Sequence, residues 1–185
     1  MKKIKNALIS VSEKTDLKSI LEMLTKYKIN IISSGGTYKK IKNLGFKCTE
    51  LSNFTKFPEI LGGRVKTLHP KIHAGILNLR DNKKHKKQMN RFSFEDIDLV
   101  IVNFYPFENT LKQKFNHKKI IENLDIGGTS LVRAAAKNYK YVTVITSNNQ
   151  YAELINELNI NKGKTSLKFR ERMSQLAFTE TAYYD

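Results

Sequence analysis

The sequence has only one cysteine, Cys48, among its 185 residues. A single thiol excludes an internal disulfide, and it excludes a metal site built from several cysteines. This composition is typical of proteins that work in a reducing compartment. We therefore expect a cytoplasmic protein.

Long hydrophobic runs are also missing. The first apolar run, at residues 7–11, follows a basic start but is shorter than the roughly 7–15 residues of a signal-peptide core. No stretch approaches the roughly 20 apolar residues of a membrane span. These absences predict a soluble intracellular protein with no membrane partner.

Acidic residues are scarce, with 17 Asp and Glu against 33 Lys and Arg, so the formal net charge is +16. Such a charge favours phosphorylated or polymeric anions as partners. The lysines are spread along the chain, however, and no basic stretch is interleaved with aromatic residues as in nucleic-acid-binding modules. We expect no nucleic-acid partner and interpret the charge as a solvated surface that can steer an anionic substrate.

Apolar runs alternate with helix-like patterns along most of the chain. The length suits one well-cored domain. We expect strands at residues 7–11, 29–32, 98–104 and 141–145, a shorter one at 48–51, and helices at 17–24, 38–44 and 131–137. Residues 80–93 fit an exposed helix or a loop. The alternation predicts an α/β fold, a Rossmann-like three-layer sandwich with a mainly parallel sheet of about five strands.

The end of the chain also has a helical pattern. From Thr165 onward there is no glycine or proline, and one helix stripe is expected to contain Leu167, Met173, Leu176, Ala177 and Phe178. The pattern is still helical where the chain stops. We expect a domain at residues 1–163 and a C-terminal helix at 164–185 that leads toward a further domain.

The loop at residues 62–71 carries the densest set of polar groups. Two lysines, an arginine, a histidine and a threonine surround Gly62 and Gly63. Glycine allows a close approach to a ligand, and Pro70 restricts the backbone, so we expect a loop of defined shape. This composition predicts the binding or transformation of an anion.

Three other expected strand ends carry polar residues, and ligands of parallel sheets bind at this edge. Residues 10–14 offer hydroxyl groups and Lys14. Residues 33–37 lead into a helix, whose first N–H groups and the hydroxyls of Ser34 and Thr37 suit a phosphate. This segment is neither a P-loop nor a dinucleotide fingerprint, and a Gly-Gly pair here also fits a plain turn.

The third strand end is Asn103-Phe104-Tyr105-Pro106-Phe107. Its amide could read a base edge and a ring could stack on it. Alternatively, Phe104 and Phe107 belong to the core and Tyr105 covers it.

Asp125 and Lys137 flank the last motif, an alanine-rich helix. Asp125 is either catalytic or a helix cap, and Lys137 is either catalytic or a surface lysine. His69 and His73 have the i, i+4 spacing of metal ligands, but Pro70 breaks that spacing and no carboxylate is close in sequence. We expect no metal.

Taken together, these motifs resemble one family. They are Ser-Val-Ser-Glu-Lys at 10–14, Ser-Ser-Gly-Gly-Thr at 33–37, Gly-Gly-Arg-Val-Lys-Thr-Leu-His-Pro-Lys at 62–71, Asn-Phe-Tyr-Pro-Phe at 103–107, Asp-Ile-Gly-Gly at 125–128 and Arg-Ala-Ala-Ala-Lys-Asn at 133–138. In this order they are similar to the N-terminal IMP cyclohydrolase domains of bifunctional purine biosynthesis proteins. Asp16 stands where many members have glycine, and Thr129-Ser130 varies the helix start.

This resemblance implies a methylglyoxal synthase-like fold and a small-molecule nucleotide substrate. The implied reaction closes the second purine ring of 5-formamidoimidazole-4-carboxamide ribotide and yields inosine monophosphate (IMP), without a cofactor or metal. It implies a possible homodimer, stronger in a longer protein, and a formyl-transfer domain outside these residues.

The resemblance also implies the site residues. Proton handling is expected from Lys66, Tyr105, Asp125 and Lys137. The nucleotide is expected to contact Ser12, Glu13, Lys14, Ser34, Gly35, Gly36, Thr37, Arg64, Val65, Thr67, Asn103, Phe104, Ile126 and Gly127. The phosphate is expected at Ser34–Thr37 with Lys14 nearby, and His69 and Lys71 are expected to support their loop.

Two alternatives share the implied fold. One is methylglyoxal synthase itself, and the other is the non-catalytic regulatory domain of carbamoyl phosphate synthetase. The motifs at 62–71 and 125–138 argue against the synthase. Lys66, Asp125 and Lys137 together argue against the regulatory domain, because a binding module needs no proton-transfer groups.

Overall fold

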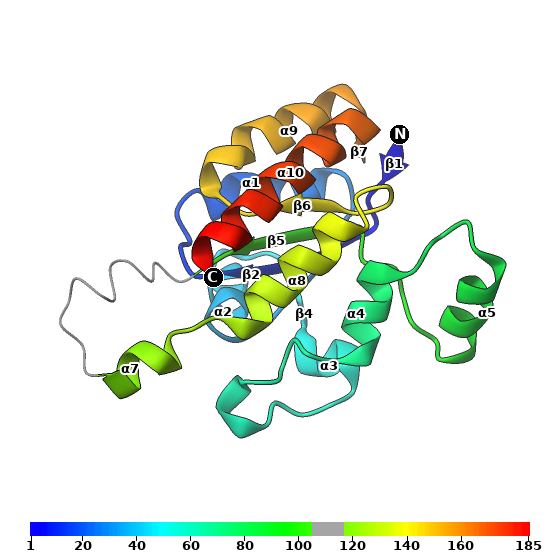
Figure 1. The fold of residues 1–185 in the computed structure, drawn as a ribbon. Coiled ribbons are helices and arrows are strands. Elements are labelled where there is room, and N and C mark those ends of the chain that lie inside the picture. Colours follow the sequence, from blue (N-terminus) through cyan, green and yellow to red (C-terminus); the bar gives the residue numbers. More distant parts are fainter. Residues whose placement is uncertain (105–116) are drawn as a thin grey trace.

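A five-stranded parallel sheet forms the centre of the molecule. The computed structural model describes residues 1–104 and 117–185. The sheet has the order β4-β3-β2-β5-β6, with helices on both faces (Figure 1). The strands are β2 (Asn6–Val11), β3 (Asn30–Ser33), β4 (Thr49–Glu50), β5 (Leu99–Asn103) and β6 (Thr143–Ile145). The predicted α/β fold class is confirmed.

A second, two-stranded sheet was not predicted. Strand β1 (Lys2–Lys3) pairs antiparallel with β7 (Lys164–Thr165), so the first residues of the chain contact the segment between α9 and α10. Strands of two residues are too short to show a period in sequence.

Helices fill the connections between the strands. They are α1 (Leu17–Lys26), α2 (Gly35–Asn43), α3 (Leu51–Thr55), α4 (Pro70–Leu77), α5 (Lys83–Arg91), α7 (His117–Glu122), α8 (Ile126–Lys137), α9 (Tyr151–Ile160) and α10 (Leu167–Tyr184), with 3-10 turns η1 (Leu61–Gly63) and η2 (Asn148–Gln150). Two of them begin earlier than predicted, because Ser34 and Asp125 are the N-caps of α2 and α8. The glycines that follow these caps belong to the first helical turn and not to a loop.

Asp16 precedes α1 with a φ of 58°, in the left-handed region. Glycine adopts this conformation freely, and aspartate is among the few other residues that tolerate it. Asp16 therefore adopts a backbone conformation that glycine also favours.

The prediction that Pro70 interrupts a helical spacing between His69 and His73 is wrong. Pro70 is the first residue of α4, where a missing N–H costs no hydrogen bond. His69 is the N-cap, and its Nδ1 accepts a hydrogen bond from the backbone N–H of Lys71 at 3.1 Å. The basic segment after α4 forms the helix α5, which projects from the body of the fold (Figure 1).

The predicted stripe of α10 is correct only in part. Met173 and Ala177 are buried, but Leu167, Leu176 and Phe178 are between 39% and 48% exposed. The other buried positions are Phe169, Arg170, Ser174 and Thr181. Polar side chains occupy this face because backbone carbonyl groups satisfy them, as when Ser174 donates to Ala136 O at 2.8 Å.

None of the helices in the described part of the chain is long and apolar enough to cross a membrane.

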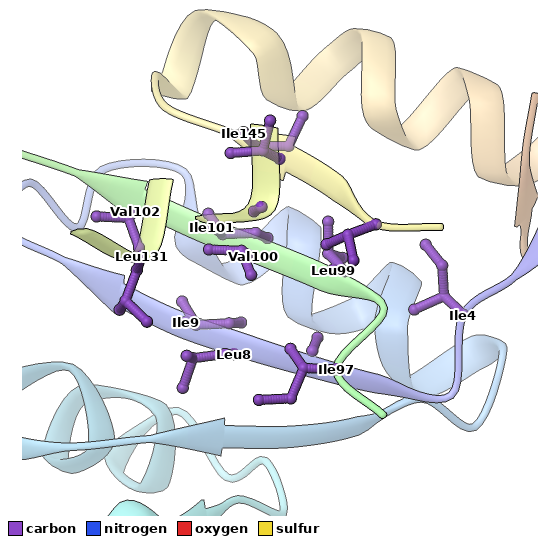
Figure 2. Packing of buried hydrophobic residues seen from close by; sticks show 14 of the residues in the cluster. Ile4, Leu8, Ile9, Ile97, Leu99, Val100, Ile101, Val102, Leu131 and Ile145 are labelled. Carbon is purple, nitrogen blue, oxygen red and sulfur yellow. The ribbon is translucent and has the colours of Figure 1, made fainter. Parts of the chain in front are cut away.

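Strand β5 lies at the centre of the hydrophobic core. Each of its residues from Leu99 to Val102 is at most 1% exposed. Figure 2 shows these side chains among Leu8 and Ile9 of β2, Leu131 of α8 and Ile145 of β6. A strand covered on both faces has apolar residues at consecutive positions, which explains its unbroken apolar sequence.

A buried ion pair joins β5 to the start of β2. The Asp98 carboxylate accepts hydrogen bonds from the backbone N–H groups of Lys5, at 2.8 Å, and Asn6, at 3.2 Å. The Arg80 guanidinium lies 3.4 Å from Asp98, and both side chains are about 95% buried, at 6% and 4% exposure. Burial raises the pKa of Asp98, whereas Arg80 and the two N–H groups oppose that rise.

Arg80 also donates to three backbone carbonyl groups, of Tyr141 at 2.6 Å, Ile97 at 2.8 Å and Gly75 at 3.3 Å. One side chain therefore holds the end of α4, the start of β5 and the segment before β6 together.

Replacing Arg80 by methionine should destabilise the fold strongly, because Asp98 would remain buried without its partner. We expect a loss of about 3–5 kcal/mol in the free energy of unfolding, measured with urea. Lys140→Met is the matched control, since Lys140 pairs with Asp81 at 2.9 Å on the exposed surface. The control should leave the urea midpoint nearly unchanged. Equal midpoints for both variants would contradict the structural role of Arg80.

Candidate functional site

The strand order creates a switch point between β2 and β5. The chain leaves β2 toward β3 on one side and leaves β5 toward β6 on the other. Ligands of open parallel sheets bind beyond the carboxyl ends of the strands at such a point. Residues 12–15 follow β2 here, and Asn103 ends β5 opposite Val11.

The start of α2 lies at the same edge. Its N-cap, Ser34, is extended, and Gly35 has a φ of 53°. The first N–H groups of a helix have no partner inside the helix, so they favour an anion. Thr37 anchors this helix start, because its hydroxyl accepts from Val11 N at 3.1 Å and donates to Val11 O at 2.9 Å. The Thr37 hydroxyl, expected to face a phosphate, is therefore used within the protein.

Two lysines from separate loops converge on this helix start. A Cβ atom placed on Gly35 would lie 3.4 Å from Lys66 Nζ, and one on Gly36 would lie 3.8 Å from Lys14 Cε. Lys14 Nζ donates to Ser12 O at 2.8 Å. Among the described residues, no carboxylate forms an ion pair with Lys66. The helix start and both ammonium groups therefore attract the same anion.

A cleft of about 600 Å³ opens beside Lys66. One wall is the 62–67 loop, and the other is the segment from the end of α7 to the start of α8. The side chains and glycines that line it include Ser10, Gly63, Arg64, Lys66, Thr67, Glu122, Asp125, Ile126, Gly127 and Gly128. Two of the expected motifs, far apart in sequence, thus form one cavity.

Asp125 caps α8 and also lines this cleft. Its Oδ1 accepts from the backbone N–H of Gly128 at 2.7 Å. In the part of the chain that the structure describes, Oδ2 has no hydrogen-bond donor. The cap is thus present, and one carboxylate oxygen remains for a ligand.

The two walls of the cleft touch at Gly127. A Cβ atom there would fall inside contact distance of the Thr67 hydroxyl, and Thr67 is buried. Only glycine permits this approach.

Tyr184, near the end of α10, is a site-supporting residue that sequence reasoning missed. Its hydroxyl accepts from the backbone N–H of Asp125 at 3.0 Å, and its ring packs on Phe104 with centroids 4.8 Å apart. Burial raises the pKa of Tyr184. No local signal could reveal a contact between residues 59 positions apart.

Arg64 lies on the rim of the cleft. It forms a two-point ion pair with Glu122, including a hydrogen bond from Nε at 3.0 Å. Both side chains are more than half exposed, so solvent screens the pair.

The Asn103 amide organises the loop after β2. Its Oδ1 accepts from the backbone N–H groups of Ser12, at 2.6 Å, and Glu13, at 3.0 Å. Its Nδ2 donates to Glu13 O at 3.0 Å and to Asn148 Oδ1 at 3.1 Å. Both the oxygen and the nitrogen of this amide bind protein groups. The Asn103 side chain is therefore better placed to support the loop than to read the edge of a base.

A smaller cavity, of about 330 Å³, lies behind the 62–71 loop. Val65, Ser34, Lys66 and His69 contribute to its lining. His69 caps α4 and its ring lies 5.7 Å from that of Phe57, and Lys71 Nζ lies 4.7 Å above the Phe54 ring. Both residues support the loop.

The structure does not bring Lys137 to the cleft. Asp125 precedes α8 and Lys137 is its last residue. The 12 residues of this helix span roughly 18 Å at about 1.5 Å each. Lys137 instead lines a separate surface hollow with His73, Ser130 and Arg133. Tyr105 lies outside the described residues.

In residues 1–104 and 117–185, no group of three or more His, Cys, Asp or Glu side chains lies close enough to hold a metal ion.

Comparison with protein-family models gives a match to the MGS-like domain over residues 16–130. The chain belongs to the MGS-like domain family. A second model, described as the AICARFT/IMPCHase bienzyme, matches residues 135–185.

Curated relatives match this MGS-like domain and its C-terminal helix together. The bifunctional purine biosynthesis protein PurH of Persephonella marina is 49% identical over 98% of the chain, and that of Rhizobium etli strain CIAT 652 is 44% identical over 98%. The chain spans about a third of their length, 35% and 34% respectively. A solved structure, the crystal structure of ForH, has a TM-score of 0.82 and 25% identity, covering 98% of this chain and 95% of that one.

Gly35→Ala should weaken anion binding by this MGS-like domain. The added methyl group would stand between the helix start and the Lys66 ammonium, where we expect the anion. We expect binding of IMP, measured by calorimetry, to weaken about tenfold, in addition to a backbone cost of about 1–2 kcal/mol in stability.

Gly45→Ala is the matched control, since its φ of 84° carries a similar backbone cost but no atom lies within 4 Å of the added Cβ. Equal IMP affinities for the two variants would argue against an anion at the α2 start.

Proposed function

We propose that this chain catalyses the IMP cyclohydrolase reaction, the dehydrative closure of 5-formamidoimidazole-4-carboxamide ribotide to IMP. The observation that carries the proposal is the convergence of Lys14 and Lys66 on the start of α2, beside a cleft that contains Asp125. The PurH relatives, named for purine biosynthesis, support the same assignment over 98% of the chain.

The 5′-phosphate is assigned to the start of α2. Backbone N–H groups of Gly35, Gly36 and Thr37 face this end of the helix, and the helix dipole adds to the charge of Lys14. The cleft of about 600 Å³ then receives the base of the nucleotide. Its volume lies in the range of ordinary small-molecule sites.

Ring closure forms a bond between the carboxamide nitrogen and the formyl carbon, and the formyl oxygen leaves as water. The carboxamide nitrogen loses one proton, the formamido nitrogen loses the second as its double bond to the formyl carbon forms, and the departing oxygen gains both. Both reacting groups belong to one molecule, so the site mainly has to hold them in attack geometry and move protons.

Asp125 and Lys66 are the groups we assign to this chemistry. Asp125 Oδ2 accepts a proton from the attacking nitrogen while Oδ1 stays on the α8 cap. Lys66 stabilises negative charge on the formyl oxygen, since its side chain lines the cleft with Asp125. Arg64 contributes charge at the rim. The predicted role of Tyr105 stays a prediction, and the position of Lys137 does not support direct proton transfer within one chain.

The direct test is to add the formylated ribotide to the purified chain and follow IMP formation by absorbance, without added folate or metal. We expect turnover of this substrate and no transfer of formyl groups to the unformylated ribotide. A folded chain that forms no IMP would refute the proposal. Formation of methylglyoxal from dihydroxyacetone phosphate would instead support the alternative enzyme of this fold.

Asp125→Asn separates the two roles of Asp125. Asparagine caps helices as well as aspartate does, so the free energy of unfolding should change by less than about 0.5 kcal/mol. Turnover should fall by roughly 10²–10⁴-fold, because the amide cannot accept the proton. Asp125→Ala should lose the turnover and about 1 kcal/mol of stability as well. Wild-type turnover in the asparagine variant would remove Asp125 from the chemistry.

A further inference from the structure

Two asparagine side chains, one at the end of β5 and one in η2, form a continuous hydrogen-bonded chain to the loop at residues 12–15. Asn103 binds the backbone of Ser12 and Glu13, as described above. Asn148 Oδ1 accepts from Asn103 Nδ2 at 3.1 Å, and Asn148 Nδ2 donates to Thr15 O at 3.2 Å. The loop is thus held at both of its ends.

These contacts cross three neighbouring strand ends. The loop follows β2, Asn103 ends β5, and Asn148 follows β6, and these strands are adjacent in the sheet. Lys14, which the loop carries to the start of α2, lies between the residues that the two asparagines hold.

The segment that carries Asn148 is itself firmly positioned. Ser147 and Gln150 form a capping box around η2, in which Gln150 Oε1 accepts from Ser147 N at 3.3 Å. The same oxygen also accepts from Thr146 N at 2.8 Å. Tyr151 follows directly and is buried. Burial, together with the nearby Glu13 and Asp16 carboxylates, raises the pKa of Tyr151 to about 12.

We propose that Asn148 is a positioning residue that fixes Lys14 at the phosphate end of the site, acting through Asn103 and Thr15. The inference rests on the proposed function for the identity of the ligand. Asn148 itself lines none of the cavities described here. Its effect should therefore reach the substrate only through the loop.

Asn148→Ala should raise KM for the formylated ribotide by roughly 3- to 10-fold, the factor that corresponds to one lost hydrogen bond. The dissociation constant for IMP should rise by the same factor. The turnover number should stay unchanged, because Lys66 and Asp125 belong to other loops. Asn149→Ala is the matched control, since Asn149 is the exposed neighbour on η2, and it should behave as wild type.

A double-mutant cycle with Lys14→Ala tests the route of the effect. If Asn148 acts through Lys14, Asn148→Ala should weaken IMP binding much less in the Lys14→Ala background than in the wild type. Equal effects in both backgrounds, or unchanged KM and IMP affinity in Asn148→Ala, would overturn the inference. A fall in turnover number together with the melting temperature would also overturn it, because that pattern indicates a general structural defect.

The cycle separates this inference from the proposed function. A wild-type chain that binds IMP without turning over the ribotide would refute the proposed function alone, and the affinities would still decide the role of Asn148.

Discussion

Asp98, at the amino end of β5, holds the backbone of Lys5 and Asn6 and is itself held by the buried guanidinium of Arg80. These contacts fix the register of β2 against β5, in which Ala7 lies opposite Leu99 and Val11 opposite Asn103. A slip of one residue would turn every side chain of a strand to the other face. The Asn103 amide would then no longer meet Ser12 and Glu13. The ion pair at the amino ends of β2 and β5 thus determines the geometry of the candidate site at their carboxyl ends.

The electrostatic potential at the candidate site depends on where individual charged groups lie more than on the net charge of +16. Most cations are solvated, as in α5, whereas Lys14 and Lys66 approach one helix start from two loops. The only carboxylate assigned to chemistry, Asp125, is bound to the start of another helix. Under the proposed function, one helix start binds the substrate's charge, and the other orients the group that moves its proton. The overall charge contributes long-range attraction of anions.

The sheet could be predicted from the sequence because buried parallel strands, such as β5, are continuous apolar runs. The helix starts at Gly35 and Ile126 could not, since glycine and polar residues there equally fit a loop. The buried face of α10 was predicted only in part, because Arg170 and Ser174 donate to backbone carbonyl groups of residues 136–140, far away in sequence. At the site, the motifs predicted the 62–67 and 125–128 walls. The contacts of Asn148 and Tyr184 could not be predicted, because they join residues far apart in sequence. The separation of Lys137 from Asp125 could not be predicted either, because it depends on where α8 begins and ends.

The central claim is that the start of α2 binds the phosphate of a nucleotide whose base occupies the cleft beside Asp125. Nuclear magnetic resonance of the ¹⁵N-labelled chain, titrated with IMP and separately with inosine, tests it most directly. The account predicts that IMP shifts the amide signals of Gly35, Gly36 and Thr37 together with those of Gly127 and Gly128. Inosine, which lacks the phosphate, should leave the α2 signals in place. Shifts by IMP that are confined to α5 or to the hollow around Lys137 would contradict it.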